Sequence, residues 1–213
     1  MSPRPYRLGK RAEIVEQTRE RIIDATRELL AREGYPNASV DEVARLADVA
    51  RATVYYQFGS KKGLIEAVVQ DIQRRAGQEA VAGSVEAADP VDAMREAFVR
   101  GSWFWAAERP LVHKLTGLAA VDADIRRILA VVERDRLPVL ERLVERLSGA
   151  QRLAPSYSTE EALHVLWMLS SFEAFDQLFT GRGLPVDDVA RLLGDLAVAT
   201  LASGSGASLE DEV

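Results

Sequence analysis

One short stretch, RATVYYQFGSKK at residues 51–62, gathers side chains of the kinds that contact nucleic acid. An arginine fork can bind guanine or a phosphate, and a threonine offers a hydroxyl for a base edge and a methyl for thymine. Tyrosine hydroxyls suit phosphate oxygens. Paired lysines at the start of a helix add their charge to backbone amides that attract a phosphate. The residues in question are Arg51, Thr53, Tyr55, Tyr56, Lys61 and Lys62.

Each of these side chains could instead be part of a packed or solvated helix, because short helices with basic residues occur in many helical proteins. For Tyr55, a phosphate contact and packing into the core are equally good interpretations. Tyr56 and Lys61 are the favoured phosphate contacts, and Arg51 and Thr53 are the favoured base readers. Two further residues, Ser39 and Ala52, complete the predicted DNA-facing set.

The distribution of charge favours a nucleic-acid partner for the N-terminal part of the chain. The 213 residues carry a net charge of −6, with 27 basic and 33 acidic side chains. Residues 1–62 hold 12 basic and 9 acidic side chains, or +3, so 63–213 hold 15 and 24, or −9. Binding depends on where charge lies and not on its total, so the acidic sum does not exclude a DNA partner.

Composition and motifs argue against an enzyme, a metalloprotein and a membrane protein. There is no cysteine, there are two histidines, and no P-loop, zinc-ligand or nucleophile-elbow motif occurs. No cofactor or metal is therefore expected. The N-terminus lacks an apolar signal region and no apolar run is long enough to span a bilayer. These features predict a soluble, cytoplasmic protein.

Almost every segment has helical periodicity, so the predicted fold class is all-α. SVDE at 39–42 is a capping box that starts a very short helix, and Ser60 can cap another. A helix over 50–58 lies between them, and Pro138 predicts a kink or break in a later one. The helices expected beyond residue 90 cover 90–108, 110–120, 122–148, 159–180 and 186–202.

Two short helices joined by a tight turn at about 39–58 form a helix-turn-helix, which can place its second helix in a major groove. The chain is therefore divided into an N-terminal DNA-binding part and a C-terminal helical bundle. The expected boundaries are a basic arm at 1–17, the helix-turn-helix domain at 18–62, a ligand-binding and dimerisation domain at 63–202, and a disordered tail at 203–213. The arm, with Arg4, Arg7, Lys10 and Arg11, could enter a minor groove or simply be solvated.

The segments RERIIDATRELLAREGY, ASVDEVARLADV and ATVYYQFGSKKGLIEAVV resemble the DNA-binding domain of TetR-type (tetracycline-repressor-like) transcriptional regulators over residues 18–69. The chain departs from that family's pattern twice. Asp48 stands where glycine is usual, although aspartate tolerates a left-handed turn better than most residues. Ala50 stands where a serine or threonine cap is usual, and its loss costs about 1 kcal/mol.

The resemblance implies a homodimer whose C-terminal domain binds a small apolar effector. Helices 159–180 and 186–202 are the expected dimer interface, as half of a four-helix bundle, although both could bury only against their own chain. Aromatic clusters could line a pocket, although aromatic residues at helical spacing are more often core. The candidate ligand-binding residues are Phe98, Trp103, Trp105, His113, Trp167, Phe172, Phe175 and Asp176.

Together these observations predict a dimeric, sequence-specific DNA-binding regulator, a repressor released from a palindromic operator by a small apolar ligand. The alternative is a helical protein that binds a small molecule and has no operator activity. Such a protein would bind a fragment of its own promoter no better than random DNA and would lack a steep salt dependence.

Overall fold

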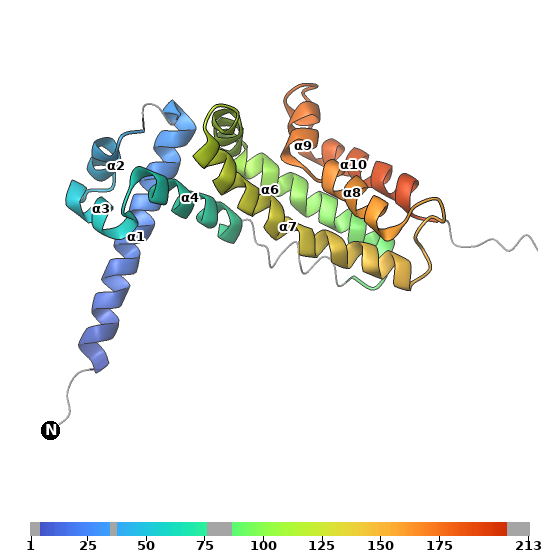
Figure 1. The fold of residues 1–213 in the computed structure, drawn as a ribbon, viewed down its shortest axis with the longest axis horizontal. Helices are drawn as coiled ribbons and strands as arrows, with labels where there is room; N and C mark the ends of the chain where they lie inside the picture. Colours follow the sequence, from blue (N-terminus) through green and yellow to red (C-terminus); the bar gives the residue numbers. More distant parts are fainter. Residues whose placement is uncertain (1–4, 35–37, 76–86, 204–213) are drawn as a thin grey trace, which may run out of the picture. The chain divides into compact units, whose positions relative to one another are not determined.

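The computed structural model describes residues 5–34, 38–75 and 87–203, and for residues 5–11 and Glu33 it describes the backbone alone. The described chain is all-α, as predicted, and its single extended pairing is an isolated bridge between Leu153 and Ala202. The helices in Figure 1 are α1 (Pro5–Glu33), α2 (Val40–Leu46), α3 (Arg51–Phe58), α4 (Lys61–Arg75), α6 (Pro90–Ala119), α7 (Ala123–Gly149), α8 (Thr159–Leu169), α9 (Phe172–Phe179) and α10 (Val186–Leu201).

The chain forms two compact units. The N-terminal unit contains residues 1–75 and 110–132, and the C-terminal unit contains 76–109 and 133–213. Helices α6 and α7 therefore each contribute residues to both units. The boundary expected after residue 62 stays a prediction, but α4 continues to Arg75 within the same compact unit as α1 to α3.

In the N-terminal unit, α1 packs against α2 and α4, and α3 packs against α2 and α4 (Figure 1). Ile22, Ala25, Leu29 and Leu30 recur at a spacing of 3–4 residues in α1 and are buried, and Gly34 ends the helix with φ of 78°. Asp48 adopts φ of 51° in the turn between α2 and α3, which confirms that aspartate takes the left-handed position there. Ala50 precedes α3 without a side-chain cap, as expected from its type.

In the C-terminal unit, α10 packs against α8 and α9, while α8 and α9 also contact each other. Gly194 of α10 lies so close to α6 that a Cβ there would be 3.5 Å from the Phe98 Cβ. The largest fully buried side chains of this unit are Met94, Leu143, Leu147, Leu166 and Phe175. They come from α6, α7, α8 and α9, so each of these helices contributes a fully buried apolar side chain to the unit.

Neither proline that was expected to interrupt a helix ends one. The helix end expected before Pro110 and the break expected at Pro138 do not occur, because α6 and α7 run continuously through these residues, while the alternative of a kink at Pro138 stays a prediction. Both prolines are exposed, so the carbonyl that each ring leaves without an amide partner can be hydrated. Conversely, the helix expected at 159–180 is two helices, because Ser171 caps a new one by accepting a hydrogen bond from the Ala174 N–H at 3.1 Å.

The boundary of the N-terminal arm at residue 17 stays a prediction, and the backbone is helical from Pro5 onward. Proline suits the first helical position, where its missing N–H has no intrahelical partner to lose. Arg4 lies outside the described residues, as do 204–213 of the predicted tail. The side chains of Arg7, Lys10 and Arg11 also lie outside what is described.

Helix caps agree with the serine-based predictions. The Ser60 hydroxyl accepts from the Gly63 N–H at 3.0 Å, and Ser39 accepts from the Glu42 N–H at 3.1 Å. The box at α2 is only half formed, because the Glu42 carboxylate binds Arg45 instead of reaching back to Ser39. At α8 the box is complete, since Glu161 also accepts from the Ser158 N–H at 2.8 Å.

The capping box of α8 makes the free energy of unfolding depend on pH in the acidic range. Hydrogen bonds from the Ser158 N–H, and then from its hydroxyl, lower the pKa of Glu161 below its usual value. A carboxyl whose pKa is lowered by folding contributes stability above its unfolded pKa and loses it as pH falls through the folded pKa. We expect Glu161→Gln to lower Tm at pH 7, and the difference from wild type to shrink as the pH falls below the ordinary value of about 4.5 and to vanish only below the lowered pKa of the folded protein. Glu160→Gln, which removes the same charge from the same turn, is the control and should change Tm less.

Candidate functional site

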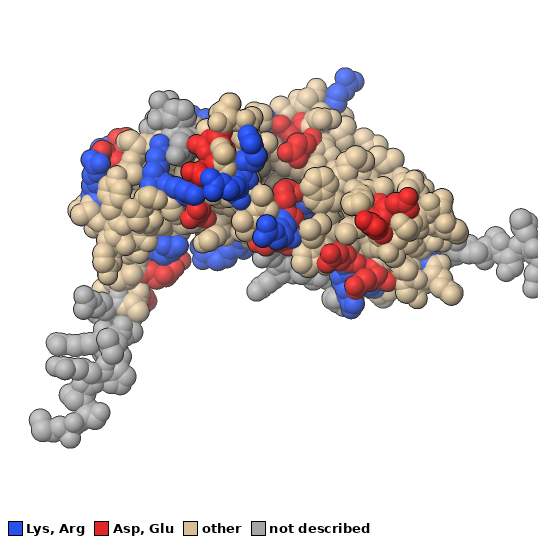
Figure 2. Space-filling model, viewed as in Figure 1, with Lys and Arg blue, Asp and Glu red and all other residues tan. Residues whose placement is uncertain are grey.

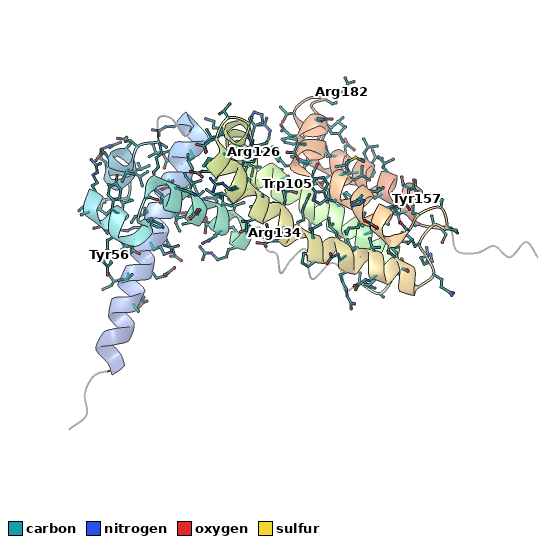
Figure 3. All side chains as sticks on the ribbon, viewed as in Figure 1. Tyr56, Trp105, Arg126, Arg134, Tyr157 and Arg182 are labelled. Atoms are coloured by element: carbon teal, nitrogen blue, oxygen red, sulfur yellow. The ribbon has the colours of Figure 1, made fainter. Side chains whose placement is uncertain are left out.

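The candidate recognition surface is the outward face of α3. Val54 turns inward and is 2% exposed, whereas Tyr56 is 87% exposed and projects away from the helix (Figure 3). Arg51, Ala52 and Tyr55 are also exposed, and Thr53 is half-buried. Because one position anchors α3, most of its residues remain available to a partner. The structure thus brings the candidate base readers, Arg51 and Thr53, onto the same short helix as the two tyrosines.

Arg51 is held at the start of α3 by residues of two helices. Its Nη1 lies 3.1 Å from Asp41 Oδ1 on α2, and its Nη2 donates to the Tyr55 hydroxyl at 3.4 Å. The guanidinium also lies over the Tyr55 ring, 5.5 Å from its centroid. The hydrogen bond with Tyr55, and then the charge of Asp41, raise the pKa of Arg51. Asp41 was not identified from the sequence, because ten residues separate it from Arg51.

The other predicted phosphate contacts lie at helix starts. Lys61 and Lys62 begin α4, and burial lowers the pKa of Lys61. Lys62 Nζ lies 3.4 Å from Asp124 Oδ1 at the start of α7. Ser39 begins α2, and its hydroxyl oxygen already accepts the capping bond from Glu42. On the face shown in Figure 2, basic side chains gather over the N-terminal unit with acidic ones beside them.

Arg19 is a further candidate that sequence reasoning missed. Its guanidinium lies over the ring of Phe58, at the end of α3, with 4.7 Å to the ring centroid. Such a contact holds the cation close to the end of the recognition helix. The sequence carried no signal for it, because Arg19 belongs to α1 and precedes Phe58 by 39 positions.

If Lys61 contacts a phosphate, its removal has a defined effect. We expect Lys61→Ala to weaken binding to all duplex sequences about equally and to reduce the slope of log K against log salt by roughly 0.9. Arg182→Ala removes one charge from an exposed loop of the C-terminal unit and is the control (Figure 3). An unchanged slope in Lys61→Ala, or an equal change in both variants, would contradict a phosphate contact at Lys61. The slope is measured by fluorescence anisotropy of labelled duplex DNA over a series of salt concentrations.

The C-terminal unit contains a small cavity between α6, α8, α9 and α10. Its volume is about 20 Å³, which is room for one water molecule and far less than a drug-sized ligand needs. Trp105 lies at its wall, and its indole N–H donates to the Ser170 carbonyl at 3.1 Å (Figure 3). Lining residues are Ala97, Phe98, Gly101, Ser102, Trp105, Leu169, Ser170, Ser171, Phe175 and Leu193.

Half of the predicted ligand-binding residues lie at this cavity. Phe98, Trp105 and Phe175 line it, and Phe172 packs edge-on against Trp105 with ring centroids 5.5 Å apart. These four side chains come from helices that are distant in sequence. Their convergence is what a pocket for an apolar molecule requires.

The other four predicted residues lie elsewhere. Trp103 is about half exposed and donates its indole N–H to Asp187 at 3.0 Å. Trp167 is exposed beneath the Arg136 guanidinium, and Asp176 accepts from Arg109 at 2.6 Å. His113 belongs to the N-terminal unit, so it is not part of this cavity. The sequence could not separate these residues from the cavity, because helical spacing does not tell which side of α6 or α8 faces α10.

Two residues at or beside the cavity were missed by sequence reasoning. Ser102 is 3% exposed and lines the cavity. Arg136 donates to the Ser170 hydroxyl at 3.3 Å and to Glu133 at 2.6 Å, and desolvation lowers its pKa. The cavity lining therefore includes three serines, Ser102, Ser170 and Ser171, with the largely buried Arg136 cation behind Ser170.

The described ranges 5–34, 38–75 and 87–203 contain neither a candidate metal site nor a candidate membrane-spanning helix. No cluster of three or more His, Cys, Asp or Glu side chains there could hold a metal ion. No helix in these ranges is both long and apolar enough to cross a membrane.

Residues 22–68 match the family model described as bacterial regulatory proteins, tetR family. The chain is 31% identical over 158 residues to the HTH-type transcriptional regulator AlkX of Mycobacterium tuberculosis, covering 72% of this chain and 66% of that protein. It is 29% identical to the HTH-type transcriptional repressor NicS of Pseudomonas putida, covering 49% of each chain. The chain thus spans only about half to two thirds of the length of these curated relatives. Both are named as regulators and not as enzymes.

Solved structures share the fold at low sequence identity. The FadR regulator of Bacillus subtilis, in complex with stearoyl-CoA, aligns with a TM-score of 0.72 at 16% identity over 85% of this chain and 98% of its own. A regulator from Saccharomonospora viridis, in complex with choline, aligns with a TM-score of 0.70 at 21% identity over 89% and 100%. With the family match over α1 to α4 and the AlkX similarity, these findings show that the chain belongs to the TetR family of bacterial regulatory proteins.

Proposed function

We propose that the protein is a homodimeric, sequence-specific DNA-binding transcriptional regulator, a repressor that a small apolar effector releases from a palindromic operator. The observation that carries the proposal is the outward face of α3 within the segment that matches the family. There Arg51, Tyr55 and Tyr56 are exposed, while Val54 anchors the helix. Arg51 and Thr53 would read base edges, and Tyr56 and Lys61 would contact phosphates.

Exposed apolar side chains on α8 and α10 support the dimer. Trp167 and Met168 of α8 and Leu192 and Leu196 of α10 are each more than 40% exposed. A monomer rarely leaves so many large apolar side chains in water without a partner. Other members of the predicted interface, Val189, Leu193 and Ala197, are buried within the chain itself. A two-fold dimer would present its recognition helices to half-sites about 34–36 Å apart or a multiple of that, hence a palindrome.

The cavity lined by Phe98, Trp105 and Phe175 is the proposed effector site. At about 20 Å³ it must expand to admit a ligand, so the ligand would select or induce a state in which α6, α8 and α9 separate. Ligands in the structures of two regulators that share the fold, stearoyl-CoA and choline, support the proposal that this fold accommodates a small molecule.

Helices α6 and α7 are the proposed route between effector and DNA. Trp105 of α6 lines the cavity, and further along the same helix Lys114 donates to the Arg32 carbonyl of α1 at 2.9 Å. At the start of α7, Asp124 pairs with Lys62 of α4. A shift of α6 would therefore displace its contact with α1, and a shift of α7 would displace its contact with α4. To go from 99% to 1% of a DNA-competent state requires about 5.5 kcal/mol of differential ligand affinity.

Binding of the intact protein to the intergenic DNA beside its own gene tests the DNA-binding proposal. We expect saturable binding with a footprint of two-fold symmetry and an affinity at least about 10³-fold above that for random duplex at the same salt concentration. Equal affinity for both DNAs would favour the alternative, a helical small-molecule-binding protein without operator activity. Size-exclusion chromatography with light scattering should give the dimer mass.

A second experiment separates the effector from the operator. Apolar compounds are screened for release of the protein from its operator, with circular dichroism to show that the protein stays folded. Trp105→Ala should change the concentration of compound that causes release and leave operator affinity in its absence within a few-fold. Failure of every compound to alter operator affinity would count against the effector and leave the DNA-binding proposal standing.

A further inference from the structure

The contact between Asp41 and Arg51 joins the two helices of the helix-turn-helix at their outward surface. Arg51 Nη1 lies between the two carboxylate oxygens, 3.1 Å from Oδ1 and 3.2 Å from Oδ2. On its other side the guanidinium meets the hydroxyl and the ring of Tyr55. Arg51 therefore has contacts with a carboxylate of α2 and with a tyrosine of its own helix before any DNA arrives.

These contacts restrict a side chain that would otherwise be very mobile. An exposed arginine has many rotamers, and a base contact must order them all. A carboxylate on one side and an aromatic ring on the other reduce that freedom in the unbound protein. The donors that Asp41 and Tyr55 do not engage stay available to a base edge, since a guanidinium carries five N–H groups.

The neighbouring carboxylate of α2 does something different. Glu42 accepts from Arg45 Nε at 3.1 Å, within the same helix. Both acidic residues occupy the first turn of α2, where a negative charge interacts favourably with the helix dipole and stabilises the helix. Only Asp41 also reaches the recognition helix. Its charge near a phosphate backbone would oppose binding of any DNA sequence, so stabilisation of α2 alone does not explain why it faces Arg51.

We propose that Asp41 is a positioning residue for base recognition, holding Arg51 toward one base pair instead of leaving it to move among nearby phosphates. This inference rests on the proposed DNA-binding function. It assigns Asp41 a part in sequence discrimination and not in overall affinity. The base edge it serves is one that an arginine fork recognises, which is the O6 and N7 of guanine.

The test selects binding sites from a randomised duplex library with the intact wild-type protein and with Asp41→Ala, Glu42→Ala, Arg51→Ala and the Asp41→Ala/Arg51→Ala double variant. Arg51→Ala should lose roughly 5- to 150-fold discrimination at one base pair of each half-site, the range of a bidentate contact. Asp41→Ala should lose at least about twofold of the discrimination at that same base pair. This is the lower end of the coupling measured between contacting residues. The affinity of Asp41→Ala for random duplex should be equal to or above that of wild type.

Glu42→Ala is the matched control, because it removes the same charge from the same helix turn. It should keep wild-type discrimination at every position. In the double variant the loss at that base pair should equal the loss in Arg51→Ala alone, since Asp41 acts through Arg51. Additive losses, or equal losses in Asp41→Ala and Glu42→Ala, would show that Asp41 only stabilises α2 and would overturn the inference.

The same data distinguish failure of this inference from failure of the proposed function. If wild type selects no sequence from the library, both the DNA-reading function and the role of Asp41 are wrong. If wild type selects a two-fold symmetric site and Asp41→Ala selects it with unchanged preference, only the role of Asp41 is wrong.

Discussion

Replacing Asp71 with alanine is expected to lower the free energy of unfolding of the N-terminal unit by about 3–5 kcal/mol, as for a buried ion pair that loses one partner. The Asp71 side chain of α4 is 1% exposed, and its Oδ2 lies 3.4 Å from Arg27 Nη1 of α1 and 2.6 Å from Arg75 Nε. Its Oδ1 lies 2.5 Å from Arg74 Nη2. Alanine at this position would remove the buried carboxylate that faces the largely buried Arg27 cation.

Arg74→Ala is the control for this substitution. The Arg74 side chain is mostly exposed, so its pair with Asp71 should contribute no more than about 1 kcal/mol. Denaturant unfolding followed by circular dichroism measures both variants. Because Asp71 ties α4 to α1, operator affinity should fall together with stability in Asp71→Ala. A cost in Asp71→Ala no greater than in Arg74→Ala would contradict the structure at this point.

Gly63→Ala is the second large effect, and its sign is unusual. Alanine normally stabilises a helix by about 1 kcal/mol relative to glycine. At Gly63 a Cβ would lie 2.2 Å from the backbone oxygen of Phe58, the last residue of α3. That oxygen cannot move without disturbing Gly59, which holds φ of 72° between the two helices. We therefore expect Gly63→Ala to destabilise the protein by about 1–3 kcal/mol, as overpacking does.

The same clash should displace the start of α4 relative to α3, so operator affinity should fall as well. Gly117→Ala in α6 provides the matched comparison, because a Cβ there would meet no atom within 4 Å. That variant should gain about 0.5–1 kcal/mol in the free energy of unfolding. Thermal and denaturant unfolding of both variants give the two signs. Stabilisation by both would mean that α3 and α4 do not approach as closely as the structure has them.

Local chemistry allowed the N-terminal helices to be predicted from the sequence. Ser60 caps α4, and Ser39 caps α2, because a serine hydroxyl at the N-cap accepts a hydrogen bond from the N–H three residues later and so stabilises the first turn. The turn at Asp48 follows from the tolerance of aspartate for a left-handed conformation. Exposure of Tyr56 follows from the single inward position, Val54, on a two-turn helix. These outcomes depend on residues within a few positions of one another.

Helix ends were predicted less well at prolines and serines, because either residue type can end a helix or lie within one. Proline disrupts a helix when the carbonyl it frees is buried, but Pro110 and Pro138 are exposed, and both helices continue. Neighbouring serines at 170 and 171 end one helix and start another, although their spacing to the apolar residues on either side fits a single helix. Solvent exposure, which local sequence does not specify, decides the first case.

By itself, the sequence determined the helical class, the helix-turn-helix and the residue types on its outer face, since each follows from periodicity and capping over short distances. Only the tertiary structure decided that Phe98, Trp105 and Phe175 share one cavity while Trp103 lies outside it. It alone joined Asp41 to Arg51 and Lys62 to Asp124. The physical reason is that periodicity defines which side of a helix is apolar, whereas the packing of separate helices defines what that side meets.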